Sequence, residues 1–308
     1  MEAFWVEILK SLVSGLLMGL VFALVALGLT VIFGVMDIVN FAHGEFLMIG
    51  MYTTLVTAPL LGVDPLITLP ICGLVGAVLG VISYYGLVKY LLRGPVIAQL
   101  FGTFGLMVFL RNLALLFMGS EPRILHKGVL VGKSFVVGPG LVLESTKLAA
   151  AVLSLASFYV VWWLINRTRL GKALTATSLD RQGARYMGIS TELMNALAWA
   201  IGGASVAIAG GVLVNFWPVD PNVGLLFTMI AFATVALGGF GSIRGALFAG
   251  IIIGFIVQIP PVWDAALGLL GLGGGDAISL HPFKYTFVYL IYFIIMIVRP
   301  QGLFGWKQ

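Results

Sequence analysis

The residues best suited to chemistry in this sequence are concentrated in a short polar stretch between two long apolar runs. It contains Asp37, Asn40, His43 and Glu45, side-chain types that can relay protons or bind a polar solute. At membrane depth such groups must be buried in protein or line a wet cavity, since each unpaired one costs several kcal/mol. Two interpretations remain open. The stretch is either a broken helix beside a translocation path or a surface turn in which Asp37 or Asn40 caps the next helix.

A second polar site is Arg111, which stands beside Asn112 in the apolar run from Val96 to Met118. A lone arginine in hydrocarbon is costly, so its side chain should face the protein interior and pair with a carboxylate or with main-chain carbonyls. Glu45 and Asp37 are the only acids expected near the membrane interior. The sequence therefore favours an ion pair between Arg111 and Glu45, with a contact between Arg111 and substrate as the alternative.

Other patterns that would indicate catalysis or metal binding are incomplete. His43, His126 and His281 lack the spacing of a metal-binding histidine motif, and the nucleophile motif G-x-S-x-G is missing from the sequence. The segment 128–134 resembles a phosphate-binding loop but has three residues between its glycines where four are needed. We therefore expect no enzymatic activity, no metal site and no cofactor in this chain.

The elements that position these groups are membrane helices. The chain has 308 residues, of which 9% are charged and 60% hydrophobic, whereas an ordinary soluble domain is roughly a quarter charged and under half apolar. This composition predicts an all-α polytopic membrane protein. The net charge of +5 is explained by basic loops beside a membrane, so we expect no nucleic-acid partner.

Nine apolar segments are candidates for crossing the bilayer core, which takes about 20 residues. They are Ile8 to Phe33, Phe41 to Leu60, Leu66 to Val88, Val96 to Met118, Leu148 to Ile165, Leu193 to Val214, Val223 to Leu237, Ala246 to Ile259, and Phe283 to Val298. Pro260 and Pro261 are expected to end the eighth. We expect one membrane domain over residues 1–308, with eight or nine helices broken or capped near 37–45 and outer loops at 119–147 and 260–283.

The basic residues predict an orientation. Nine crossings with an inner C-terminus place ten Lys and Arg residues on one side and six on the other, so the first side should face the cytoplasm and the N-terminus should lie outside. The densest group lies in the loop 166–192, where the pattern predicts one or two short helices. Such helices favour a protein partner, although a basic loop against anionic lipid is the alternative.

Four blocks of residues, in this order along nearly the whole chain, resemble the permease subunits of branched-chain amino-acid ABC importers. They are Asn40-Phe-Ala-His-Gly-Glu45 with Met48-Ile-Gly50, then Arg169-Leu-Gly-Lys-Ala173 with Asp180, Ala184 and Gly188-Ile189, then Leu237-Gly-Gly-Phe-Gly-Ser242 with Gly245-Ala246, and finally Arg299-Pro-Gln-Gly-Leu303. The first and third blocks are specific when they occur together.

The resemblance implies a multi-pass permease of a bacterial or archaeal cytoplasmic membrane. It would move branched-chain amino acids inward by alternating access, with other neutral amino acids, amides, urea or aromatic acids as further candidates. The implied partners are a homologous second permease, two cytoplasmic ATP-binding subunits that bind the ATP, an extracytoplasmic substrate-binding protein and membrane lipid. The alternative is a proton-coupled secondary transporter or channel that works without ATPases and uses Asp37, His43 and Glu45 as a proton relay.

The resemblance also implies roles for particular residues. The substrate path would be lined by Asn40, His43, Glu45, Gly238, Gly239, Gly241 and Ser242. Coupling to the ATPases would involve Arg169, Gly171, Ala173, Asp180, Ala184 and Gly188. The chain departs from the family pattern at Arg111, where glutamine is common, and at Ile230, where lysine is common. Charge changes of this kind bear on which substrate is favoured.

Overall fold

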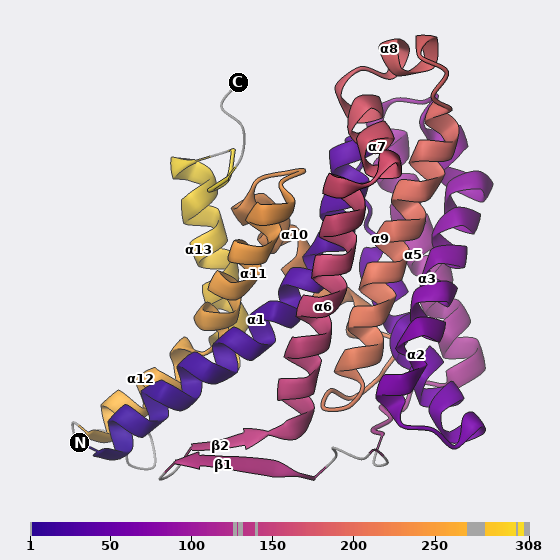
Figure 1. The fold of residues 1–308 in the computed structure, drawn as a ribbon. Helices are drawn as coiled ribbons and strands as arrows, with labels where there is room; N and C mark the ends of the chain where they lie inside the picture. Colours follow the sequence, from indigo (N-terminus) through magenta and orange to yellow (C-terminus); the bar gives the residue numbers. More distant parts are fainter. Residues whose placement is uncertain are drawn as a thin grey trace.

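The computed structural model describes residues 2–125, 128, 132–138, 141–269, 281–299 and 301–304. In these residues the chain forms a helical bundle with one small β-hairpin (Figure 1). The elements are α1 Glu2–Met36, α2 His43–Leu61, the 3-10 helix Pro65–Thr68, α3 Leu69–Ser83, a π-helical turn Tyr84–Val88, α4 Lys89–Leu91, α5 Val96–Met118, β1 Ser134–Gly138, β2 Leu141–Glu144, α6 Ser145–Arg167, α7 Arg169–Leu179, α8 Arg181–Tyr186, α9 Thr191–Leu213, α10 Val223–Gly238, α11 Ile243–Val257, α12 Ile259–Leu269, the 3-10 helix His281–Phe283 and α13 Lys284–Val298.

The helices confirm the predicted class of an all-α polytopic membrane protein. In the part of the chain that the structure describes, seven helical segments are long and apolar enough to span a membrane, and α10 and α13 are shorter apolar helices. Each of the nine predicted apolar segments overlaps one of these helices. The two short helices expected in the loop 166–192 are also present, as α7 and α8.

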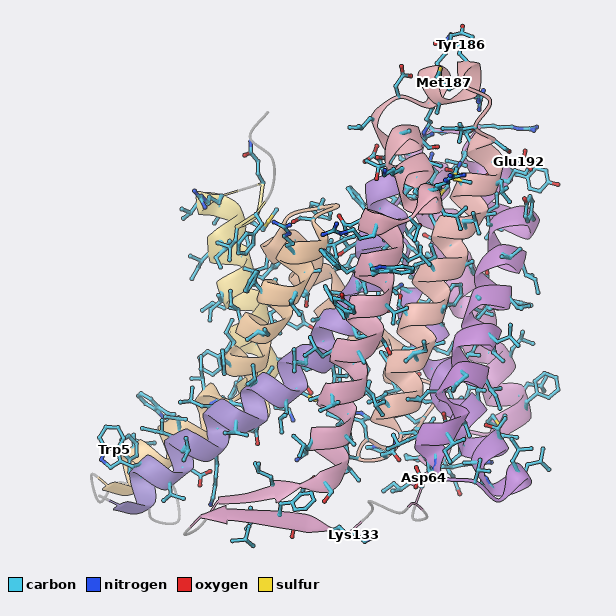
Figure 2. The ribbon with its side chains drawn as sticks, viewed as in Figure 1. Trp5, Asp64, Lys133, Tyr186, Met187 and Glu192 are labelled. Carbon is cyan, nitrogen blue, oxygen red and sulfur yellow. The ribbon has the colours of Figure 1, made fainter. Side chains whose placement is uncertain are left out.

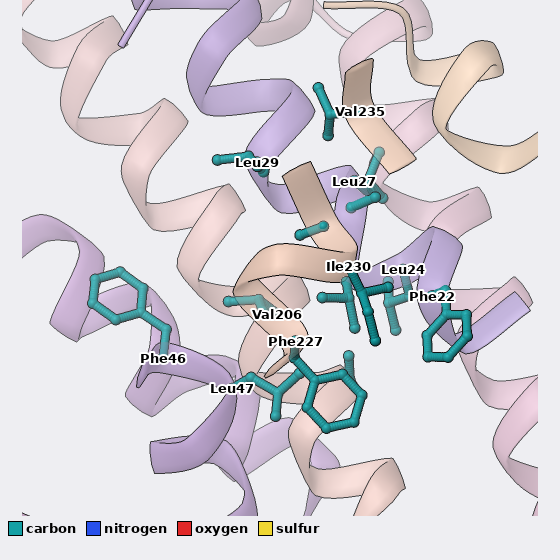
Figure 3. Packing of buried hydrophobic residues seen from close by; sticks show 14 of the residues in the cluster. Phe22, Leu24, Leu27, Leu29, Phe46, Leu47, Val206, Phe227, Ile230 and Val235 are labelled. Atoms are coloured by element: carbon teal, nitrogen blue, oxygen red, sulfur yellow. The ribbon is translucent and has the colours of Figure 1, made fainter. Parts of the chain in front are cut away.

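Helix α1 organises the bundle. Its 35 residues give it a length of about 52 Å, well beyond the roughly 30 Å of a bilayer core, and it runs obliquely from the N-terminus to α7 (Figure 1). Residues 21–32 are buried on every side, as expected for a helix that is apolar all round. Figure 3 shows the resulting core, in which Phe22 and Leu24 lie near Phe227 and Ile230 of α10.

Small residues allow the helices to approach closely. A Cβ atom at Gly15 of α1 would come within 3.1 Å of the carbonyl oxygen of Gly254 in α11, and one at Gly19 within 2.9 Å of that of Gly250. Without a hydrophobic driving force between helices in lipid, such close contacts supply much of the association energy.

Two expectations about the loops were incomplete. Helix α11 ends at Val257, just before Pro260 and Pro261, as expected. The two prolines, however, lie in the first turn of a further helix, α12, where a missing amide proton costs no hydrogen bond. The outer loop expected at 260–283 therefore contains α12, and its residues 270–280 lie outside the described residues. The loop expected at 119–147 carries the antiparallel β1–β2 hairpin, which the sequence analysis did not predict.

The molecule has two distinct ends. The α7 end comprises α7, α8, the last turn of α1 and residues 301–304, and the hairpin end comprises β1, β2, α12 and the start of α1 (Figure 1). Figure 2 places Tyr186, Met187 and Glu192 at the α7 end and Trp5, Asp64 and Lys133 at the hairpin end.

Candidate functional site

The polar break, residues 37–45, reaches deep into the bundle. Helix α1 ends at Met36, and Asp37 follows in the left-handed region with a φ of 55°. His43 begins α2, and its Nε2 atom lies 2.8 Å from the main-chain carbonyl oxygen of Val25. Val25 precedes Met36 by eleven residues, or about 16 Å along a helix. The chain therefore re-enters the bundle beside α1, which corresponds to a broken helix at depth and not to a surface turn.

The cap expected for α2 is formed differently. The residue at the N-cap position is Ala42, whose amide donates to Oδ1 of Asn40 at 3.0 Å. One residue into the helix, the amide of Gly44 donates to Oγ1 of Thr228 in α10 at 2.9 Å. The start of α2 is thus held by a side chain from its own segment and by one from a different helix.

The structure brings Asn40, His43 and Glu45 together as fully buried residues, each with 0% exposure. Each also keeps one polar atom without a hydrogen-bond partner among the described residues: Asn40 Nδ2, His43 Nδ1 and Glu45 Oε2. Buried polar atoms are normally paired, so exceptions of this kind call for an explanation such as a functional role. The polar break is therefore the strongest candidate for a solute-binding or conformational site.

Arg111 and Glu45 form the ion pair that the sequence favoured. The Nη2 atom of Arg111 lies 2.7 Å from Oε1 of Glu45, and the side chains are 19% and 0% exposed. Gly224 of α10 packs against the same carboxylate, because a Cβ there would come within 2.9 Å of it. The pair links α2 to α5 at the polar break, and it neutralises a charge that would otherwise be buried alone.

The structure places Gly238, Gly239, Gly241 and Ser242 away from His43 and Glu45, close to the end of α1 that precedes the polar break, where Gly241 packs on Gly34. They form the turn between α10 and α11 at the α7 end, with positive φ angles of 95° at Gly239 and 77° at Gly241 and with Ser242 as the N-cap of α11. Thr228, which contacts the polar break, precedes Gly238 by ten residues, or about 15 Å along α10. A substrate path lined both by His43 and Glu45 and by this glycine turn must run along this length of α10.

The departure from the family pattern at Ile230 lies in the apolar core. Its side chain is 0% exposed and belongs to the cluster formed by α1, α9 and α10 (Figure 3). A cation there would be buried among apolar side chains. In this chain Arg111 of α5 carries a positive charge within a membrane helix, and position 230 is uncharged.

The predicted coupling residues shape the α7–α8 element. Gly171 packs so closely on the carbonyl oxygen of Ile165 that a side chain would collide with it. Asp180 is the N-cap of α8 and accepts hydrogen bonds from two amides at 2.9 Å. Gly188 takes a φ of 79° after α8, whereas Ala184 is buried, Ala173 is partly buried and Arg169 is exposed.

Sequence reasoning missed one residue that connects this element to the polar break. The Nη2 atom of Arg181 donates a hydrogen bond of 3.0 Å to the carbonyl oxygen of Met36. Met36 is the last residue of α1, immediately before the polar break. The only signal in the sequence was the density of basic residues in 166–192, which does not single out Arg181.

Comparisons with known proteins agree with the pattern of blocks. The family model described as "Branched-chain amino acid transport system / permease component" matches residues 11–298. The high-affinity branched-chain amino acid transport system permease protein BraD of Pseudomonas aeruginosa is 29% identical, over 96% of this chain and 95% of BraD. LivH of Escherichia coli strain K12, which carries the same description, is 29% identical over 96% of this chain and 95% of LivH. The probable branched-chain amino acid transport permease protein LivH of Methanocaldococcus jannaschii is 30% identical, over 92% of this chain and 89% of its own.

Proposed function

This chain belongs to the family of branched-chain amino acid transport permeases, and from that premise we propose that it is the membrane subunit of an ATP-driven importer. The cargo would be leucine, isoleucine and valine or related neutral amino acids. Residues 1–308 would act as one permease domain in a bacterial or archaeal inner membrane. The α7 end would face the cytoplasm, with the N-terminus outside and the C-terminus inside.

The observation that carries the proposal is the α7–α8 element. It projects beyond the membrane-spanning helices and exposes Leu179, Tyr186 and Met187, each more than three-quarters accessible (Figure 2). An exposed apolar group with basic neighbours at the end of a bundle suits a protein partner. We assign this surface to the two ATP-binding subunits, which would supply the ATP site. The permease itself would carry no cofactor and catalyse no reaction.

Coupling would run through the hydrogen bond between Arg181 and Met36. When the ATPases close on nucleotide, they move α8, and α8 displaces the end of α1 and the polar break behind it. Because nucleotide binds one state of the assembly better than the other, it shifts the equilibrium between outward-open and inward-open states. The buried atoms of Asn40, His43 and Glu45 that now lack partners would contact the amino acid when the path opens.

A homologous second permease would cover α5. Most residues of α5 are not buried within this chain, yet its middle carries Arg111, which is 19% exposed, and the exposed Asn112. Polar groups at mid-span face protein or a water-filled cavity and avoid lipid tails. We therefore infer that this face meets a second permease across the path, while a substrate-binding protein delivers cargo at the hairpin end.

Reconstitution tests the proposal against a proton-coupled transporter. The chain should move no leucine in liposomes under a proton gradient, and ATP-dependent uptake should appear only with the ATPases, second permease and binding protein. Uptake by the chain alone on a proton gradient would refute the importer. No structural observation favours that rival, because no hydrogen bond connects Asp37, His43 and Glu45 among the described residues.

A further inference from the structure

A cavity of about 300 Å³ opens at the hairpin end, away from the polar break. It lies between α1 and the starts of α6 and α13, and the segment before α10 closes it on a further side. Its size is at the lower limit for small-molecule sites, which run from about 300 to 1,000 Å³. The cavity therefore suits a compact solute of few atoms.

The polar side of the cavity is cationic. Lys147 and Lys284 both line it. Lys147 pairs at 3.0 Å with Glu144, and both side chains of that pair are well exposed, so the pair is weak and exchangeable. Lys284 has no carboxylate within ion-pair distance in the part of the chain that the structure describes. The site thus holds an ammonium group that is available to an anion.

Two aromatic rings fix the position of that ammonium group. The Nζ atom of Lys284 lies 6.0 Å from the ring centroid of Trp217 and 5.0 Å from that of Tyr285. Contacts of a cation with ring faces are favourable within about 6 Å. Both rings also line the cavity. The charge is therefore held at the cavity wall, and no carboxylate among the described residues pairs with it.

Apolar side chains of α1 form another part of the lining. They include Leu17, Val21 and Phe22. Phe22 lies 6.5 Å from Phe227 between ring centroids. Phe227 is followed in α10 by Thr228, the residue that binds the polar break. The ring of Phe22, which lines the cavity, is thus connected through Phe227 to the residue that binds the polar break.

We propose that this cavity is the permease's own binding site for an aliphatic α-amino acid, with the carboxylate on Lys284 and Lys147 and the side chain on Leu17, Val21 and Phe22. The inference rests on the proposed importer function and specifies the substrate class. The α-ammonium group would face the side-chain oxygen of Gln258, which also lines the cavity. A charged side chain would have to be desolvated against the apolar wall, which is costly, so glutamate and lysine would be excluded.

Direct binding tests the site. The full-length permease, purified with its membrane and ATPase partners but without binding protein, is placed in phosphatidylcholine nanodiscs, and binding of radiolabelled L-leucine is measured. Lys284→Met should weaken binding about tenfold, Lys147→Met less, and Lys284→Arg little. Lys133→Met is the matched control, since Lys133 is an exposed lysine at the same end that does not line the cavity. Thermal melting of each variant checks that it folds.

Analogues identify the recognised group. Because the proposed contact is with the carboxylate, 4-methylpentanoate should compete with leucine, whereas 3-methylbutylamine, which lacks the carboxylate, should not. Equal leucine affinities for Lys284→Met and Lys133→Met would overturn the site. Anionic phosphatidylglycerol should leave leucine affinity unchanged, and displacement of leucine by this lipid would assign the lysines to headgroup phosphate and overturn the proposal.

The experiments distinguish a failure of the importer function from a failure of the amino-acid site. ATP-driven leucine uptake by the wild-type complex, together with unaltered binding in Lys284→Met, would leave the importer standing and remove this site. A wild-type complex that transports no amino acid would remove the importer and the substrate class together.

Discussion

Arg181 of α8 and Met36 of α1 are separated by 145 residues in sequence and joined by a hydrogen bond of 3.0 Å. The donor is a guanidinium on the element proposed to meet the ATPases. The acceptor is the main-chain carbonyl of the last residue before the polar break. This geometry makes the end of α1 responsive to the position of α8, because a displacement of one must stretch or break the bond to the other.

Removing this bond should uncouple transport from ATP hydrolysis. A hydrogen bond to a charged group contributes about 1.5–3 kcal/mol, so Arg181→Ala should lower uptake per ATP hydrolysed roughly tenfold. Uptake and ATPase rates are measured together in proteoliposomes. Arg167→Ala is the control, since Arg167 is an exposed arginine at the same end whose side chain makes no hydrogen bond among the described residues. An unchanged ratio of uptake to hydrolysis in Arg181→Ala would remove this bond from the coupling mechanism.

The ion pair at the polar break should dominate the stability of that region. Arg111→Ala leaves the Glu45 carboxylate buried without its cation, which typically costs about 3–5 kcal/mol. The double variant Glu45→Gln, Arg111→Gln removes both charges and should regain most of the lost stability. Thermal unfolding in detergent compares the three proteins. If the double variant were less stable than Arg111→Ala, the pair would not be the source of the effect.

Glu45 should also matter for transport itself. Its second carboxylate oxygen has no hydrogen-bond partner in the described part of the chain, so it can bind an amino acid once the path opens. Glu45→Gln keeps the shape and removes the charge, and we expect at least a tenfold fall in the maximal rate of leucine uptake. Asp64→Asn at the hairpin end is the control for loss of a carboxylate. Wild-type uptake kinetics in Glu45→Gln would restrict Glu45 to holding α5 in place.

The sequence predicted most of the fold because run length and apolar composition are local properties. The nine helical segments needed only the thickness of the bilayer. An ion pair of Arg111 with a buried acid also followed, since few acids lie near the membrane interior, whereas the choice of Glu45 over Asp37 came from the structure. The depth of the polar break did not follow, because it depends on the contact of His43 with Val25. The sequence also did not reveal that the turn at Gly238 lies away from His43 and Glu45, since no local pattern reports the 15 Å or so of α10 between this turn and Thr228.

Two other features depend on context that a sequence pattern does not contain. Proline ends a preceding helix but is tolerated in the first turn of a new one, so Pro260 and Pro261 predicted the end of α11 and not the start of α12. The hydrogen bond from Arg181 joins two segments whose proximity is set by the whole bundle. Arg181 is one of several arginines in the loop 166–192, and the sequence alone does not distinguish it from the others.

The cap of α8 provides a graded test of the α7–α8 surface. Asparagine is as good an N-cap as aspartate, and alanine costs about 0.5–2 kcal/mol. We therefore expect Asp180→Asn to retain the ATPases during purification, Asp180→Ala to retain fewer, and Asp180→Lys to lose them, because a cation meets the positive end of the α8 dipole. Gly171→Trp should act through a different contact, by pushing α7 from Ile165. The amount of ATPase that copurifies with each folded variant is measured by quantitative mass spectrometry, and uptake should fall in the same order. Full retention of ATPases in both Asp180→Lys and Gly171→Trp would mean that the motor subunits bind elsewhere on the chain.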